Sequence, residues 1–271
     1  MSTPPLLTDR TALLRNRSRA SAWFLHDEAI VDVQERLAEV NRTFTSPAIV
    51  TGFPEVWRRI LPGDTTLVAD DETLELQPES HDLVVHAMGL HWANDPVGQL
   101  VQCRRALRPD GLFLGVCFGG QTLHQLRSVL AEAETETTQG LSPRIAPMAE
   151  IRDLGALLQR AGFALPVADS IPHRVSYDST LALMRDLKAM GEGNALAARL
   201  RHPSRRQMFA RAEALYRENF QGADGRLLAT FEMIFLTGWA PSADQPKALR
   251  PGSASARLAE ALGTKETKLK D

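Results

Sequence analysis

The segment 82–88, DLVVHAM, most limits what this chain can fold into. Its apolar residues are continuous rather than alternating, which is typical of a strand covered on both faces of a sheet. Similar apolar runs recur, and the segments between them carry apolar residues at the helical spacing of three or four. These runs are PAIVTG at 47–52, TTLVAD at 65–70 and LFLGVCF at 112–118. Strands that alternate with helices predict the α/β class, with a parallel sheet and right-handed crossovers.

The last third of the chain has a different pattern. FALPVADSIPHRVSY at 163–177 predicts an extended segment, and TFEMIFLTGWA at 230–240 predicts a strand. Two helical stretches lie between them, an arrangement that suits an antiparallel last strand. We therefore expect N-terminal helices, an α/β domain with a helical insertion, and a C-terminal tail. In residue numbers these parts are 1–43, 44–240 with the insertion at about 179–219, and 241–271.

The composition indicates the cellular compartment and the classes of partner to expect. Cys103 and Cys117 are too few for a disulfide framework, so we expect buried, reduced thiols. Residues 1–9 lack the basic and apolar regions of a secretory signal. No apolar run approaches the roughly 20 residues of a membrane helix, and the net charge of -2 gives no reason to expect nucleic-acid binding. The expectation is a cytoplasmic protein with no integral membrane segment and no nucleic-acid partner.

Several short motifs follow one another in a fixed order within residues 66–127. They are an acidic pair after LVA, an LHW(x)ND turn, an LxPDGxF step and FGGxTLxxLR; SPRIAP, DLGALLQRAGF, LMRDLKAMGEGNA, FLTGWAP and LRPGSASARL follow downstream. With these motifs the chain resembles class I S-adenosylmethionine-dependent methyltransferases. It is most similar to the subgroup of biotin-pathway carrier-protein methyltransferases and bacterial relatives of a mitochondrial complex I assembly factor. The resemblance extends from Asp9 to Leu262.

This resemblance implies a Rossmann-like sheet of seven strands, mostly parallel with an antiparallel last strand. It also implies that S-adenosylmethionine binds at the carboxyl ends of the first strands. A glycine-rich turn there approaches the methionine moiety, an acid after the second strand holds the ribose hydroxyls, and an acid after the third strand approaches the adenine amine.

The chain departs from that pattern after its first apolar run. TGFPEVW keeps only Gly52 of the expected glycines, and the bulkier Phe53 and Pro54 follow it. Only one short helix separates the runs at 47–52 and 65–70, whereas a complete βαβ unit takes roughly 30 residues. We therefore expect a sheet that is one strand short, no residue in the ribose-binding role, and a degenerate cofactor site.

Candidate site residues lie at the predicted carboxyl ends of the strands. Those assigned to cofactor binding are Gly52, Asp70, Asp71, Glu72, His86 and Ala87, and those assigned to a substrate pocket are His91, Trp92, Gly119 and Gly120. The acids also fit a solvated loop, and the glycines also fit turns that need no ligand. His91 is a candidate general base because histidine titrates near neutrality, although loop packing is the favoured interpretation.

Two further patterns have simpler explanations. His86, His91 and Asp95 match no known metal-ligand spacing, so no metal is expected. The basic cluster at 199–211, RLRHPSRRQMFAR, fits an acidic or nucleic-acid partner, but a solvated helix face is favoured.

The favoured function is a methyltransferase-like protein with an eroded cofactor site, acting on a protein client as an assembly factor for a respiratory complex. The alternative is an active methyltransferase on a small-molecule or protein substrate. Protein hydroxylation is a third function that the resemblance permits, without an iron-ligand constellation in the sequence. The missing strand would leave a less protected sheet edge, so a homo-oligomer is also predicted.

Overall fold

The computed structural model describes residues 6–61, 63–245 and 263–264. By its internal contacts the chain divides into one unit of residues 1–241 and a second of residues 242–271. The architecture below is that of the first unit. Most of the tail expected at 241–271 lies outside the described residues.

A six-stranded sheet forms the centre of the described part of the chain, in the order β2-β1-β3-β4-β6-β5. The strands are β1 (Pro47–Thr51), β2 (Thr66–Val68), β3 (His81–Ala87), β4 (Leu107–Gly119), β5 (Ala164–Tyr177) and β6 (Leu227–Trp239). The pairs among β2, β1, β3 and β4 are parallel, whereas β6 runs antiparallel to both β4 and β5. The predicted α/β class and the antiparallel last strand are confirmed.

The sheet has one strand fewer than the resemblance implies. The connection from β1 to β2 consists of α3 (Pro54–Trp57) and the 3₁₀ turn η1 (Arg58–Ile60). It returns the chain beside β1, with Ala48 opposite Thr66 and Val50 opposite Val68. A dozen or so residues are enough for one parallel crossover, so β2 closes the sheet edge at the place where a further strand would otherwise pair. The expected shortening is therefore confirmed.

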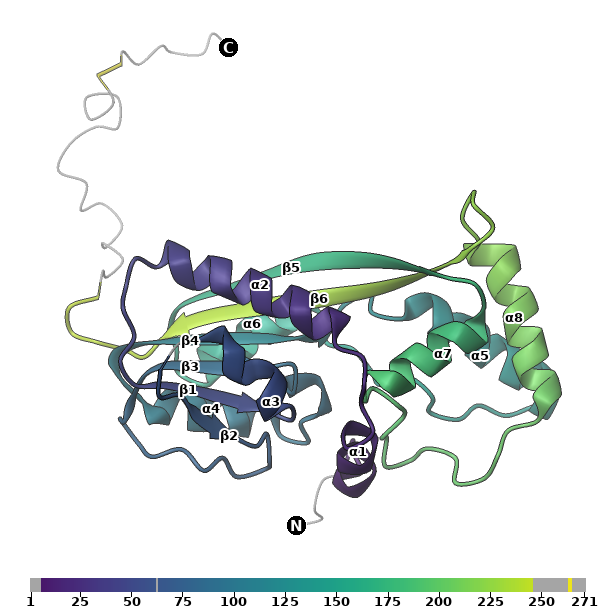
Figure 1. The fold of residues 1–271 in the computed structure, drawn as a ribbon, viewed down its shortest axis with the longest axis horizontal. Helices are drawn as coiled ribbons and strands as arrows, with labels where there is room; N and C mark the ends of the chain where they lie inside the picture. The colour runs from purple at the N-terminus through teal and green to yellow at the C-terminus, as the bar shows by residue number, and fades with distance from the viewer. Residues whose placement is uncertain (1–5, 62, 246–262, 265–271) are drawn as a thin grey trace, which may run out of the picture. The chain divides into compact units, whose positions relative to one another are not determined.

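Helices cover both faces of the sheet (Figure 1). Their bounds are α1 (Arg10–Arg17), α2 (Phe24–Glu39), α4 (Pro96–Ala106), α5 (His124–Thr138), α6 (Ile151–Arg160), α7 (Thr180–Ala189) and α8 (Arg206–Phe220), with a second 3₁₀ turn η2 (Leu90–Trp92). Alternation along β1 separates two cores: Ile49 packs in the core that includes α2, whereas Ala48 and Val50 pack in the core that includes α4 and α6. Continuous apolar runs form these strands because both faces are buried.

The strands β5 and β6 extend beyond the others toward α5, α7 and α8, which gather at one end of the unit (Figure 1). The helices α7 and α8 lie between β5 and β6 in the sequence. α7 begins after Ser179, whose side chain accepts a hydrogen bond from the Ala182 N–H.

Two element boundaries differ from what local sequence patterns indicate. Leu107 continues the helical spacing of Leu100 and Cys103, but α4 ends at Ala106 and Leu107 begins β4. Thr122 is a residue type that often caps helices, but α5 follows Leu123, which adopts a left-handed φ of 54°. The Thr122 hydroxyl instead donates to the carbonyl of Gly119.

Three further features complete the description of the fold. The Asp9 side chain caps α1 by accepting from the Ala12 N–H. Cys103 and Cys117 are both free and buried. Among the described residues, no helix combines the length and apolar character that crossing a bilayer requires.

Candidate functional site

The carboxyl ends of β1, β2 and β3 meet at one edge of the sheet, where open α/β sheets bind ligands. Thr51 at the end of β1 is the register partner of Ala87 at the end of β3, and Val50 pairs with Val68 of β2. This register brings together Gly52, Asp70 and His86, three of the residues that the sequence assigned to cofactor binding. Ala87 is fully buried within β3.

A buried ion pair fills this edge. Nη1 of Arg17, the last residue of α1, lies 2.7 Å from Oδ1 of Asp70, and the side chains are 3% and 2% exposed. Nη2 of Arg10 lies 3.4 Å from the same oxygen. Burial opposes ionisation of Asp70, but the hydrogen bond and charge of Arg17, with the charge of Arg10, hold the pKa of this carboxyl below its usual value.

The ion pair occupies the space that two glycines leave open. A Cβ atom placed on Gly52 would lie 2.1 Å from Nη1 of Arg17, and one placed on Gly89 would lie 2.5 Å from Oδ2 of Asp70. The guanidinium therefore lies directly over the turn after β1. Gly52 is needed here for contact with the chain's own arginine, whether or not a ligand ever approaches it.

Phe53 closes the same turn from the side. Its ring packs edge-on against His26 and Trp23, at centroid distances of 4.7 and 5.3 Å, and the guanidinium carbon of Arg17 lies 5.5 Å from its centroid. Burial lowers the pKa of His26 to about 4, so this ring is neutral at pH 7 and its Nδ1 accepts from Nε1 of Trp57 at 3.0 Å. Phe53, Trp23, His26 and Trp57 thus form a packed aromatic cluster beside the turn after β1.

His86 takes part in a network that fixes its protonation. Nε2 of Gln99 donates to the carbonyls of Asp70 and Asp71, so Oε1 of Gln99 is left to accept from Nε2 of His86 at 2.8 Å. Burial lowers the pKa of His86. The neutral ring therefore carries its proton on Nε2, and its Nδ1 is buried without a partner among the described residues.

His91 and Trp92 are joined by a residue to which the sequence assigned no role. Nε1 of Trp92 donates to Oε2 of Glu192 at 2.7 Å, and Nε2 of His91 lies 3.2 Å from the same oxygen. Glu192 is 8% exposed, and its other oxygen is buried without a hydrogen-bond partner among the described residues. Burial opposes its ionisation, but the charges of His91 and Arg17 and both hydrogen bonds hold its pKa below the usual value.

The remaining acids of the β2 turn bind other parts of the chain. Asp71 pairs with Arg10 at 2.7 Å and is 58% exposed. Oε1 of Glu72 accepts from the side-chain amide of Asn94 at 2.8 Å. Both acids therefore help to fasten the N-terminal segment and the loop after η2 to this edge of the sheet.

Gly119 and Gly120 are explained by packing. A Cβ on Gly119 would lie 2.8 Å from the carbonyl oxygen of Ala149, and one on Gly120 would lie 2.2 Å from Oε2 of Glu232. Gly120 also has a φ of +49°, which favours glycine.

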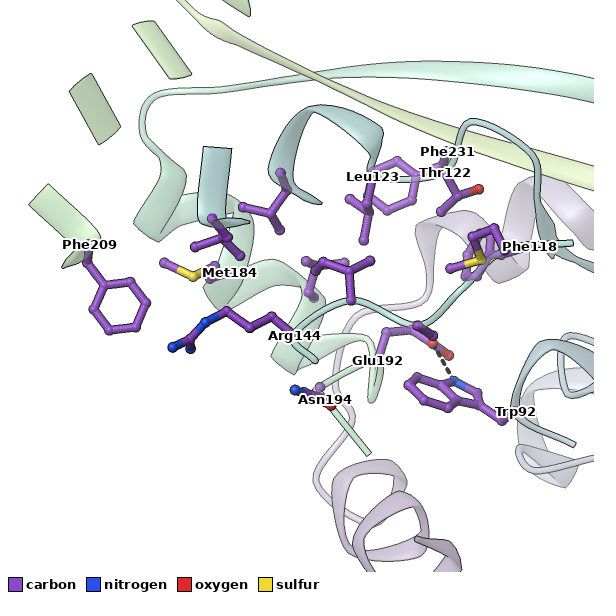
Figure 2. Close-up of a pocket in the computed structure, with 17 residues that line it drawn as sticks. Trp92, Phe118, Thr122, Leu123, Arg144, Met184, Glu192, Asn194, Phe209 and Phe231 are labelled. Atoms are coloured by element: carbon purple, nitrogen blue, oxygen red, sulfur yellow. Dashed lines mark hydrogen bonds between the residues drawn. The ribbon is translucent and has the colours of Figure 1, made fainter. Parts of the chain in front are cut away.

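A cavity of about 250 Å³ lies beside this edge, toward α5, α7 and α8 (Figure 2). Trp92 and Glu192 line one end of it, and Met184 and Phe209 line the other (Figure 2). Of the predicted pocket residues, Trp92 is in its wall, whereas His91, Gly119 and Gly120 are not. Most of the wall is apolar, from residues that include Phe118, Leu123, Leu126, Met148, Leu187 and Phe231. The cavity therefore suits an apolar group, with the Glu192 carboxylate at one end.

The described residues hold no cluster of three or more His, Cys, Asp or Glu side chains arranged to bind a metal ion. Sequence reasoning missed Arg17 and Glu192, the two residues on which the buried charges of this edge depend.

Comparison with known proteins places the chain in a family. The model of a methyltransferase domain, Methyltransf_11, matches residues 28–115. Arginine-hydroxylase NDUFAF5, mitochondrial, of Danio rerio is 39% identical over 194 residues, which are 72% of this chain and 60% of that protein. Malonyl-[acyl-carrier protein] O-methyltransferase of Laribacter hongkongensis (strain HLHK9) is 38% identical over 196 residues, which are 72% of this chain and 63% of that protein.

A methyltransferase-family protein of Rickettsia prowazekii (strain Madrid E), RP459, is 32% identical over 175 residues, which are 65% of this chain and 74% of that protein. The chain spans less than two thirds of the length of the NDUFAF5 and carrier-protein relatives. It belongs to the class I S-adenosylmethionine-dependent methyltransferases and is similar to both groups within that family. The resemblance inferred from the sequence motifs is confirmed.

Proposed function

We propose that this chain is a methyltransferase-like protein with a degenerate cofactor site, and that it acts on a protein client as an assembly factor for a respiratory complex. The observation that carries the first part is the Arg17–Asp70 pair over Gly52. A cytoplasmic location and an α/β domain at 44–240 with its insertion at about 179–219 belong to the same proposal.

The fit of S-adenosylmethionine to these residues supports the proposal. In this family the methionine moiety approaches the glycine turn after the first strand. Here that space contains the guanidinium of Arg17, and the Phe53 ring closes its side. Asp70, the acid that faces Gly89, already has its charge compensated by two arginines. The residues as arranged do not fit the cofactor, and we derive no chemical step through it.

The short crossover supports the proposal independently. The ribose-binding acid of the family follows its second strand, and the connection from β1 to β2 has no further strand within the described residues. Moving Arg17 aside would clear the space over Gly52 but leave Asp70, just after β2, still paired with Arg10.

The client role rests on the subgroup resemblance in the downstream motifs. Within the described residues, those motifs lie in α6, in α7 and the loop after it, at the end of β6, and in part of the cavity wall. These elements are folded and packed, whereas side chains fill the cofactor edge. A surface that binds a client needs folded elements and does not need an open cofactor site.

Calorimetric titration with S-adenosylmethionine and its demethylated product tests the cofactor proposal. We expect no binding below millimolar concentration. Micromolar binding would overturn the degenerate site and restore an active methyltransferase, the function that the carrier-protein relative has by name. A rise in affinity on Arg17→Met, with the exposed Arg15→Met on the same helix as matched control, would show that the guanidinium itself excludes the nucleoside.

The client role is tested in cells. Cells of the source organism that lack the chain should contain less assembled respiratory complex on native gels, and the wild-type gene should restore it. An unchanged amount would contradict the assembly role. Self-association through the β2 edge stays a prediction, and light scattering at micromolar concentration measures it.

A further inference from the structure

The helix α7 has a second, partly apolar stripe outside the face that attaches it to the core. Its inward face consists of the buried Thr180, Leu183 and Leu187. A second stripe, spaced by three, four and seven residues from its first member, is Leu181, Met184, Arg185 and Lys188. Leu181 is 51% exposed. A helix in contact with a single core needs only one such stripe.

The helix α8 presents a stripe of the same spacing to the same place. It consists of Arg206, Phe209, Ala210 and Glu213. Between the two stripes lies a groove of about 670 Å³, which Ser179 and Thr180 close at one end of α7. Two helices that face each other across an apolar floor leave room for a third helix on top of them.

The charges around this groove are unbalanced. Within the described part of the chain, no carboxylate forms an ion pair with Arg185, Lys188 or Arg206, all of which are exposed. Glu213, the acid among the lining residues of the groove, binds other groups. Its Oε2 accepts from the Thr180 N–H at 2.7 Å, and its Oε1 pairs with Arg217 at 2.7 Å. The apolar floor is therefore bordered by uncompensated positive charge.

We propose that this groove, lined by α7 and α8, binds an acidic amphipathic helix of a protein client. An amphipathic helix inserts residues at i, i+3, i+4 and i+7 into an apolar groove, and Asp or Glu beside those residues would meet Arg185, Lys188 and Arg206. Complementary charge also speeds encounter and excludes basic helices. The proposal rests on the client role above and names the chemistry of that client.

The groove adjoins the cavity described earlier. Met184 and Phe209 line both, and Figure 2 shows them at the end of the cavity away from Glu192 and Trp92. A helix in the groove would therefore contact the two side chains that form that wall. The basic cluster that the sequence left as a solvated face contributes Arg206 and Phe209 to this surface.

Fluorescence anisotropy with a designed peptide tests the proposal on the full chain. The probe is a fluorescein-labelled peptide of about 18 residues, ~27 Å long when helical, with Leu at i, i+3, i+4 and i+7 and Glu at the flanking positions. The control peptide has Lys at every Glu. We expect the Glu peptide to bind at least roughly tenfold more tightly, and the difference to shrink at high salt. Equal binding of both peptides, or binding of neither, would overturn the proposal.

Charge reversal on the protein locates the site. Arg185→Glu with Lys188→Glu should weaken binding of the Glu peptide at least roughly tenfold. Arg152→Glu with Arg160→Glu on α6 makes the same change of charge on exposed residues of another helix, and it should leave binding unchanged. The reversed α7 variant should in turn bind the Lys peptide, a gain that misfolding cannot produce. Unchanged binding in the α7 variant would overturn the proposal.

A lipid surface is the other partner that an apolar, basic groove could meet. Sedimentation with vesicles that contain phosphatidylserine distinguishes the two: binding to vesicles without binding to the Glu peptide would overturn the protein-helix proposal. Peptide binding needs no cofactor. The peptide experiment can therefore contradict the groove proposal without contradicting the degenerate cofactor site. It can also support the groove proposal if the cofactor site proves intact.

Discussion

Arg17 and Asp70 form an ion pair of 2.7 Å that joins the end of α1 to the residues after β2, with side chains 3% and 2% exposed. Nε and Nη2 of Arg17 and Oδ2 of Asp70 have no hydrogen-bond partner among the described residues. The pair therefore compensates charge without satisfying every polar atom. Such pairs contribute little net stability, but each partner depends strongly on the other.

Arg17→Met should accordingly cost about 3–5 kcal/mol of unfolding free energy, because it leaves the Asp70 charge buried with only Arg10 near it. Arg17→Met with Asp70→Leu should recover most of that loss, since no buried charge remains. Urea unfolding followed by circular dichroism measures both variants. A neutral single variant would show that the pair is solvated and does not hold α1 in place.

Stability should fall as the pH is lowered from about 6.5 toward 4. The folded pKa of His26 is about 4 because of burial, below its ordinary value of 6.5. Between these two pH values His26 is protonated in the unfolded chain but neutral in the folded chain. Lowering the pH to 4 therefore reduces the free energy of unfolding by about 3 kcal/mol. Asp70 and Glu192 also have lowered folded pKa values, so their contribution is lost at still lower pH.

Urea unfolding at pH 7.5, 6.0 and 5.0 measures this slope. Asparagine keeps an acceptor near the position of Nδ1, so His26→Asn preserves the Trp57 contact without a titrating group. It should flatten part of the slope, while His86 retains the rest because its pKa is lowered in the same direction. A slope that His26→Asn leaves unchanged would assign the whole effect to other groups.

The strands could be predicted from the sequence because burial on both faces gives a local apolar run, as in β3 and β4. The shortened edge followed from the length of the connection after β1, whereas the order of the strands came only from the structure. The end of α4 could not be placed, because Leu107 continues the helical stripe of Cys103 while belonging to β4. Periodicity reports which face of an element is buried and carries no information about where the element stops.

The site was less predictable than the fold. Asp70, His86 and His91 were found because they lie at or soon after the carboxyl ends of strands. Their partners Arg17, Gln99 and Glu192 come from other elements. Arg17 and Asp70 are far apart in the sequence, and no spacing rule joins them. The sequence did carry one local signal for Glu192, which lies between Gly191 and Gly193 and so in a turn. In the structure Gly191 has a φ of +82°, a conformation that favours glycine.

Glu192→Ala should destabilise the protein by about 1–3 kcal/mol, because the indole N–H of Trp92 then lies buried without an acceptor. Glu192→Gln keeps an acceptor oxygen and should cost less. Thermal unfolding compares the two, and Trp92 emission reports whether the indole environment changes. Equal costs would mean that the charge of Glu192, and not its hydrogen bond to Trp92, holds this loop.

Phe53→Gly should not create an S-adenosylmethionine site, because Arg17 still lies over Gly52 and no ribose acid is supplied. It should instead destabilise the chain by about 3–5 kcal/mol through the cavity left against Trp23 and His26. Calorimetric titration and urea unfolding measure the two effects. Micromolar affinity in this variant would show that the ring merely plugs an intact pocket.

Two glycines should respond to alanine in opposite directions. Gly120 has a φ of +49°, and its Cβ would lie 2.2 Å from Oε2 of Glu232, so Gly120→Ala should cost more than about 1 kcal/mol. Gly155 lies inside α6, and its Cβ would make an ordinary 3.5 Å contact with Ala168. Gly155→Ala should stabilise by about 0.5–1 kcal/mol through helix propensity. Urea unfolding of both variants tests the pair, and a destabilised Gly155→Ala would show that α6 packs more closely on β5 than these distances imply.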